Sequence, residues 1–168
     1  ERTEWLISTL LKIARLESGT VQFSDESIPI EALVNDILEP LEILMDIKDI
    51  SISCDIKNNA SFIGDRFWST EAIGNILKNC IEHCPNGGKL EIYSTENPFY
   101  TEVIISDNGT GFDEKDIPHL FDRFYRGSNS ANESAGIGLN LSRMIISKQN
   151  GVITAANKIG GGAQFTIR

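Results

Sequence analysis

Apolar residues recur every three or four positions in four stretches of the chain, a spacing that predicts helices with one buried face. The expected helices cover residues 1–17, 30–46, 65–84 and 138–149. Ser18-Gly19 and Gly151 supply stops after the first and the last helix. The second helix is expected to continue through Pro40, because its apolar stripe resumes after that residue.

Shorter apolar segments between the helices predict strands. They lie at residues 50–56, 90–95, 101–106, 152–156 and 164–168. Asn97-Pro98 suits a hairpin connection, and three glycines at 160–162 suit a turn. The order of elements favours an α/β (α+β) fold, a two-layer sandwich in which three helices cover one face of a mixed, mostly antiparallel sheet.

Length and composition agree with one domain, since 168 residues with 40% hydrophobic content can supply a sizeable core. The net charge of -9 excludes a general nucleic-acid binder. Cys54, Cys80 and Cys84 form no CxxC pair, so neither a disulfide framework nor a zinc ribbon is favoured, and Cys80 and Cys84 are expected in the core. No apolar run is long enough for a transmembrane helix, and the start at Glu1 suggests a piece of a longer protein.

Charge is unevenly distributed along the chain. Residues 21–60 contain nine acids and two bases, whereas residues 136–168 contain four bases and no acid. We interpret the acidic run as a solvated helix surface, with a partner-binding surface as the less favoured alternative.

The expected helix at 65–84 begins after Asp65, a suitable N-cap, and turns Phe67, Ile73, Ile76, Leu77, Cys80 and Ile81 toward the core. Its other face carries a line of polar residues, because Glu71, Asn75, Asn79 and His83 are spaced four apart. Asn is a poor helix former, so two of them within a helix need an explanation. Either this helix face is simply exposed to solvent, or the amide oxygens line a magnesium and phosphate site.

Two glycine-containing loops add further candidate chemistry. Asp107 follows an apolar strand and precedes Gly109 and Gly111, so it could accept a hydrogen bond from an exocyclic amine of a flat ligand; a plain turn is the alternative. The segment 134–139 precedes a helix whose free amides could bind phosphate, although it is neither a Walker A loop nor a dinucleotide fingerprint. The long segment between these loops is expected to form a lid over a ligand.

Four motifs, in this order, resemble the N, G1, F and G2 boxes of the ATP-binding catalytic domain of bacterial sensor histidine kinases, in the superfamily of gyrase and chaperone ATPases. They are NILKN at 75–79, DNGTG at 107–111, LFDRFYR at 120–126 and GIGL at 136–139. The helix before them resembles the second helix of the dimerisation and phosphotransfer domain. The resemblance therefore implies a partial dimerisation domain at 1–18 and a catalytic domain at 19–168, with a lid at about 112–135.

The resemblance implies roles for the matching residues. Asn79 and Asn75 are expected to bind Mg²⁺, Asp107 to bind the adenine of ATP, and Asn75 and Arg126 to take part in catalysis. Phe121 and Phe124 are expected to anchor the lid. The full set expected at the nucleotide is Asn75, Lys78, Asn79, His83, Asp107, Gly109, Gly111, Phe121, Phe124, Tyr125, Arg126, Gly136, Ile137, Gly138 and Leu139.

The implied function is ATP-dependent phosphorylation of a histidine, followed by transfer to an aspartate of a response regulator receiver domain. Neither His83 nor His119 fits the phosphoacceptor motif, so the acceptor is expected upstream of Glu1. The resemblance also implies homodimerisation through the dimerisation helices, a cytoplasmic location for this domain, and membrane attachment only through a preceding region.

Two alternatives remain open at this stage. His83 and Asn140 depart from the family pattern, so the chain could be a degenerate nucleotide-binding scaffold. A related ATPase or serine kinase of the same superfamily is the other alternative. A gyrase-like ATPase is disfavoured because Asn75 stands where a water-activating glutamate would be expected.

Overall fold

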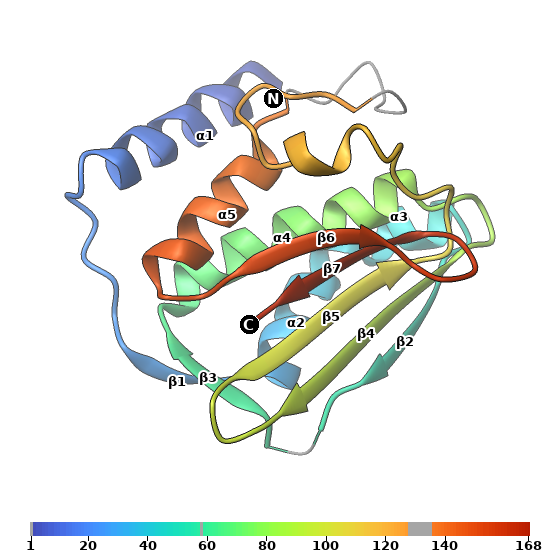
Figure 1. Cartoon of the computed structure of the whole chain (residues 1–168), viewed down its shortest axis with the longest axis horizontal. Helices are drawn as coiled ribbons and strands as arrows, with labels where there is room; N and C mark the ends of the chain where they lie inside the picture. Colours follow the sequence, from blue (N-terminus) through green and yellow to red (C-terminus); the bar gives the residue numbers. More distant parts are fainter. Residues whose placement is uncertain (1, 58, 128–135) are drawn as a thin grey trace.

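The structure is a computed structural model that describes residues 2–57, 59–127 and 136–168. One layer is a five-stranded sheet in the order β2-β4-β5-β7-β6 (Figure 1). Only β2 and β4 pair in parallel, and the other neighbours are antiparallel. The strands are β2 (Ser51–Asp55), β4 (Lys89–Glu96), β5 (Thr101–Asp107), β6 (Ile153–Asn157) and β7 (Ala163–Ile167).

Three helices form the second layer on one face of this sheet, as the sequence predicted (Figure 1). They are α2 (Ile30–Leu38), α4 (Arg66–His83) and α5 (Gly138–Lys148), and α1 (Arg2–Glu17) lies beside α5. The core between the layers is mostly aliphatic, with fully buried side chains that include Ile76, Leu77, Leu90, Ile92, Ile105 and the aromatic Phe165. None of the helices in the described part of the chain has the length and apolar character needed to cross a membrane.

The prediction of a single helix at 30–46 was wrong. The chain instead forms α2, a 3₁₀ turn, η1 (Glu39–Leu41), and a separate short helix, α3 (Glu42–Ile47). Pro40 explains the break, because a proline lacks an amide hydrogen and its ring collides with the carbonyl one turn earlier.

Two short strands were not predicted. β1 (Glu26–Pro29) and β3 (Ser61–Gly64) pair antiparallel as a separate two-stranded sheet. Each has four residues, too few to display a clear alternation. The strand expected at 50–56 is present as β2, an edge strand of the sheet on which Ile52 and Cys54 are exposed.

Helix α4 positions most of the candidate site. Its N-cap is Asp65, as predicted, with Oδ1 accepting a hydrogen bond from the Trp68 amide at 3.0 Å. The prediction that Phe67 belongs to the core face of α4 was wrong, because Phe67 is 64% exposed. Trp68 is buried instead. Phe67 lies off the helical line of buried residues formed by Ser69, Ala72, Ile73, Ile76, Leu77 and Cys80.

Candidate functional site

Asp107 forms the buried end of the candidate site, at the last residue of β5. Its side chain is 2% exposed, and its Oδ1 accepts hydrogen bonds from the Gly109 amide at 2.8 Å and the Ala163 amide at 3.2 Å. The other oxygen, Oδ2, is buried and has no N–H or O–H hydrogen-bond partner among the described residues, and the Cys80 thiol beside the carboxylate is only a weak donor. A buried carboxylate oxygen is costly without a donor, so this atom suits a ligand N–H group.

Two thiols lie close to the Asp107 carboxylate. Cys80, in the last turn of α4, and Cys84, the residue directly after α4, are buried, and all three cysteines are free. Burial, and then the charge of Asp107, raise the pKa of both buried thiols. The thiols therefore remain protonated near neutral pH and are not nucleophiles, which confirms the interpretation of Cys80 and Cys84 as small core residues.

Glycines let the backbone close around Asp107. Gly162 has a φ of +101°, and a Cβ atom there would lie 1.9 Å from the Asp107 carbonyl oxygen. At Gly109 a Cβ atom would lie 2.9 Å from the His83 carbonyl oxygen, at the end of α4. The end of β5, the turn before β7 and the end of α4 thus meet where only hydrogen atoms fit.

The polar line on α4 continues away from Asp107. Asn75 and Asn79 are half-buried and His83 is exposed, whereas Glu71 forms an ion pair with Lys12 of α1 at 2.8 Å. Asn75 Nδ2 is buried and lacks a hydrogen-bond partner within the described residues. A Cβ atom at Gly138 would lie 3.7 Å from Asn75 Oδ1. The start of α5 therefore lies directly against Asn75, which brings two of the sequence motifs together.

Lys78 points away from this line. Its ammonium group lies 5.8 Å from the centre of the Trp5 ring of α1 and 3.8 Å from Glu82 Oε1. The structure thus places this expected nucleotide-binding residue at the contact between α1 and α4.

The middle of the expected lid contacts Gly136, the residue that directly follows the lid. The Phe124 amide donates to the Gly136 carbonyl oxygen at 2.9 Å, and a Cβ atom at Gly136 would lie 2.3 Å from the Tyr125 carbonyl oxygen. Tyr125 also donates through its hydroxyl to Oδ1 of the buried Asp116 at 2.7 Å. Arg126 is exposed beside this junction. The rest of the expected lid, residues 128–135, lies outside the described residues.

The predicted aromatic anchors of the lid differ from each other. Phe121 is 7% exposed and packs edge-on against Phe165, with the ring centres 6.3 Å apart, so it is anchored in the core. Phe124 is 58% exposed with a φ of +64°, so its side chain is not an anchor. Asn140, the departure from the family pattern in α5, donates through Nδ2 to the Phe121 carbonyl oxygen at 2.9 Å. This bond ties α5 to the segment that carries Phe121.

Sequence reasoning missed several residues of the site. Asn157 of β6 exchanges two hydrogen bonds with the Phe112 backbone, at 2.7 and 2.9 Å, and so fixes the chain directly after Gly111. Gly162 and Ala163 contact Asp107 from the other end of the chain. The three glycines at 160–162 were the available signal, but they indicated only a turn.

The residues present fit a magnesium-bound phosphate group better than a metal held by the protein alone. No cluster of three or more His, Cys, Asp or Glu side chains in the described ranges could hold a metal ion. Amide oxygens of Asn75 and Asn79 are hard ligands, and phosphate oxygens of a ligand would complete the coordination. The start of α5 at Gly138 presents backbone amides on the same side as Asn75.

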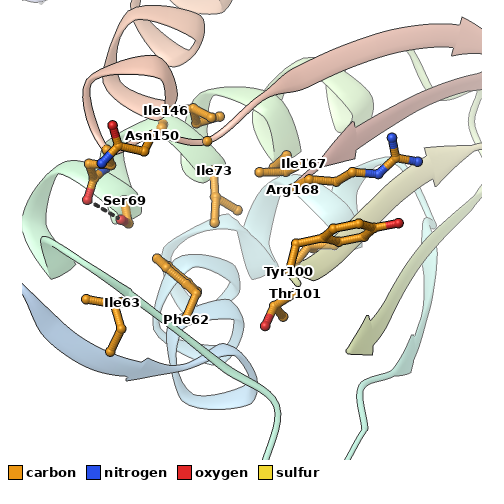
Figure 2. Close-up of a pocket in the computed structure, with 14 residues that line it drawn as sticks. Phe62, Ile63, Ser69, Ile73, Tyr100, Thr101, Ile146, Asn150, Ile167 and Arg168 are labelled. Atoms are coloured by element: carbon orange, nitrogen blue, oxygen red, sulfur yellow. Dashed lines mark hydrogen bonds between the residues drawn. The ribbon is translucent and has the colours of Figure 1, made fainter. Parts of the chain in front are cut away.

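A separate apolar cavity of about 200 Å³ lies between the layers at the opposite end of β5. Phe62 of β3, Ile73 of α4 and Tyr100, the residue before β5, line it (Figure 2). Thr101, another lining residue, is about 20 Å from Asp107 along the strand, at about 3.3 Å per residue. The cavity is therefore distinct from the candidate site, and the sequence did not indicate it.

Residues 64–168 match the family described as histidine kinase-, DNA gyrase B-, and HSP90-like ATPases, and the chain belongs to this family. Its relatives are sensor histidine kinases. The sensor-like histidine kinase SenX3 of Mycobacterium tuberculosis is 24% identical over 165 residues, which cover 96% of this chain and 40% of SenX3. The chain spans 20–43% of the length of the curated relatives that it matches.

Solved structures share the fold. The histidine kinase AdeS of Acinetobacter baumannii gives a TM-score of 0.82 with 24% identity, covering 98% of this chain and 76% of that one. ShkA, solved in complex with AMPPNP, gives a TM-score of 0.84 with 19% identity, covering 96% of this chain and 34% of that one. These findings confirm the predicted fold class and the resemblance to the ATP-binding catalytic domain of histidine kinases.

Proposed function

We propose that this chain binds ATP together with Mg²⁺ and supplies the phosphoryl group for a protein histidine. The observation that carries the proposal is the unpartnered Oδ2 of Asp107, a buried acceptor at the deep end of the site. The exocyclic amine of adenine is a donor of matching chemistry. ShkA, whose structure contains an ATP analogue, has the same fold and supports the choice of ligand.

The remaining residues provide binding for the phosphates at the other end of the site. Asn75 and Asn79 would hold Mg²⁺ through their amide oxygens, and the backbone of Gly136, Ile137, Gly138 and Leu139 would hold phosphate oxygens at the start of α5. A bound Mg²⁺ supplies neutralisation of phosphate charge. Arg126 would add a second positive charge beside the lid.

Phosphoryl transfer requires little covalent chemistry from a protein, so positioning and charge neutralisation account for the role of this domain. Asp107 orients the base, and the lid base formed by Phe124, Tyr125 and Gly136 would keep water from the phosphates. His83 is exposed and Lys78 lies over the Trp5 ring of α1, so this proposal gives neither of them a contact with the nucleotide.

The larger protein in which this domain acts is part of the same proposal. Residues 1–18 would be the second helix of a dimerisation and phosphotransfer domain, and 19–168 the catalytic domain with its lid at about 112–135. The acceptor histidine would lie on a preceding helix of a homodimer. The phosphoryl group would then pass to an aspartate of a receiver domain, and a preceding region would attach the kinase to a membrane.

Calorimetric titration with a non-hydrolysable ATP analogue, with and without Mg²⁺, tests the site. Asp107→Asn should weaken binding by roughly 30-fold or more, since hydrogen bonds to charged groups contribute about 2 kcal/mol and an amide N–H would face the adenine amine. Asp55→Asn, on the exposed edge strand β2, is the matched control and should bind like the wild type. Equal affinities for Asp107→Asn and the wild type would refute the proposed adenine contact.

A further inference from the structure

Helix α4 ends without the usual left-handed cap. The residue after it, Cys84, is extended, with φ of -66° and ψ of 135°, and its amide closes the last turn on the Cys80 carbonyl oxygen at 2.8 Å. The carbonyl groups of the last turn therefore need donors from elsewhere in the fold. This matters because α4 carries the polar line of the candidate site.

Lys48, which directly follows α3, supplies those donors. Its ammonium group donates to the carbonyl oxygens of Ile81 at 2.8 Å, Glu82 at 2.8 Å and Cys84 at 2.7 Å. A lysine has three N–H donors, so all of them are used, and the positive charge lies at the negative end of the helix dipole. The Lys48 carbonyl oxygen also accepts from the Gly87 amide at 2.8 Å.

The turn held by Lys48 forms one wall of the base-binding end of the site, the end that contains Asp107 and Gly109. Gly109 closely approaches the His83 carbonyl oxygen, and Cys84 Sγ lies 3.6 Å from Asn108 Oδ1. The same Asn108 oxygen accepts from the Lys89 amide at 2.7 Å. The last turn of α4 is thus fastened on one side to Lys48 and packs on the other against the residues that follow Asp107.

The metal-binding end of the site, where Asn75 lies, is distant from the contact between Lys48 and the last turn of α4. Asn75 precedes His83 by eight residues, which corresponds to about 12 Å along a helix. Fraying of the last turn would therefore disturb the wall beside Asp107 before it disturbed Asn75 or the start of α5.

We propose that Lys48 is a positioning residue for the base-binding end of the nucleotide site, and this inference rests on the proposed function. Lys48 does not touch the nucleotide. It holds the end of α4 so that the Asp107 carboxylate and the Gly109 backbone keep their spacing for the adenine ring.

The experiment measures the two ends of the site separately. Binding of adenosine reports the base end, and the ratio of ADP affinities with and without Mg²⁺ reports the metal end. Lys48→Met removes the three donors at similar volume, and Lys57→Met is the matched control, since Lys57 is an exposed lysine of the same acidic region. We expect about tenfold weaker adenosine binding in Lys48→Met, with an unchanged Mg²⁺ ratio.

Amide hydrogen exchange provides a readout without nucleotide. In Lys48→Met, exchange should accelerate at residues 81–88 and 107–109 and remain unchanged in the first three turns of α4. Lys48→Gln, which keeps two donors without the charge, should give intermediate values in both measurements.

Several results would overturn the inference. Unchanged adenosine binding in Lys48→Met, or a Mg²⁺ ratio that falls together with adenosine binding, would remove the specific role at the base end. Failure of both Lys48 variants to fold would make Lys48 a residue of the global fold instead. A wild-type chain that binds no adenine nucleotide would refute the proposed function itself, and the inference with it.

Discussion

The two ends of the candidate site differ in how completely the protein builds them. At the base end, Asp107 is buried, two backbone amides hold one of its oxygens, and Gly162 and Gly109 press against it. At the phosphate end, Asn79 is half-buried and Arg126 is exposed. In the proposed function, the base end is thus preorganised, whereas the phosphate end would be completed by the ligand and its metal.

This difference explains where binding energy should arise. A preformed acceptor loses little entropy when the base arrives, so the base end contributes affinity at low cost. Groups that become ordered only on contact with the phosphates contribute to affinity only when the whole nucleotide is bound. Variants should therefore have unequal effects at the two ends.

Among the variants considered, Gly162→Ala should have the largest effect, because it disrupts the base end of the site. The added methyl group would meet the Asp107 backbone, and a φ of +101° is open only to glycine, so we expect destabilisation of roughly 3 kcal/mol or more and loss of nucleotide binding. Thermal unfolding and calorimetric titration measure the two effects. Gly160→Ala is the control, because φ is similar at +97° but nothing lies within 4 Å of the new Cβ atom. Equal destabilisation by the two variants would mean that the close approach to Asp107 is unimportant.

Asn79→Ala should weaken the phosphate end alone. Losing one amide ligand should reduce affinity for the Mg²⁺ complex of ATP by about tenfold and leave adenosine binding unchanged. Titrations of adenosine and of Mg²⁺-ATP provide the comparison. A parallel fall in adenosine affinity would indicate that the two ends are not separable.

Tyr125→Phe tests the base of the lid with a smaller expected effect. The hydroxyl group donates a hydrogen bond to Oδ1 of the buried Asp116 at 2.7 Å, so its removal should lower the free energy of unfolding. Chemical denaturation gives the free energy of unfolding. We expect nucleotide affinity to fall only two- to threefold, and a loss as large as that of Asn79→Ala would place Tyr125 at the phosphates themselves.

The pH dependence of the Lys158–Glu91 ion pair should give the smallest effect. Lys158, and then Lys89, lower the pKa of Glu91 to about 2 by hydrogen bonding. The lowered pKa of Glu91 stabilises the folded state at pH values above the ordinary pKa of a glutamate. That stabilisation disappears as the pH falls toward 2. The pair is partly exposed, so the contribution is about 0.5 kcal/mol after screening.

Thermal unfolding of the wild type and of Glu91→Gln between pH 6 and pH 2 tests this expectation. The melting temperatures should differ slightly near pH 6 and converge as the pH falls through the shifted pKa. A difference that grows toward low pH would contradict the assignment of the shift to Lys158 and Lys89.

Elements with long and regular patterns were predictable from the sequence. The buried stripes of α4 and α5 and the hairpin of β4 and β5 lie where periodicity placed them. β1 and β3 were not predictable, because four residues carry no clear period. The exposure of Ile52 depends on the position of β2 at the sheet edge, which local sequence does not encode.

The same distinction applies to the candidate site. Asp107 and Gly109 lie within one motif, so their proximity follows from the chain itself. Ala163 is 56 residues beyond Asp107, and their contact exists only because β5 pairs with β7. Asn157 reaches Phe112 from β6 in the same way. Contacts of this kind depend on strand order, which the motifs did not reveal.

The separation of charge along the chain acquires a spatial meaning in the folded molecule. The acidic residues 21–60 include β2, and the basic residues 136–168 include β6, which are the two opposite edges of the sheet (Figure 1). Most of those acids lie on α2, η1, α3 and the residues that flank them, with only Asp55 on β2, whereas Arg143 and Lys148 lie on α5 and β6 itself carries no charge. In dilute salt, an anionic surface would therefore be repelled more strongly by the side of the molecule formed by α2 and α3 than by α5.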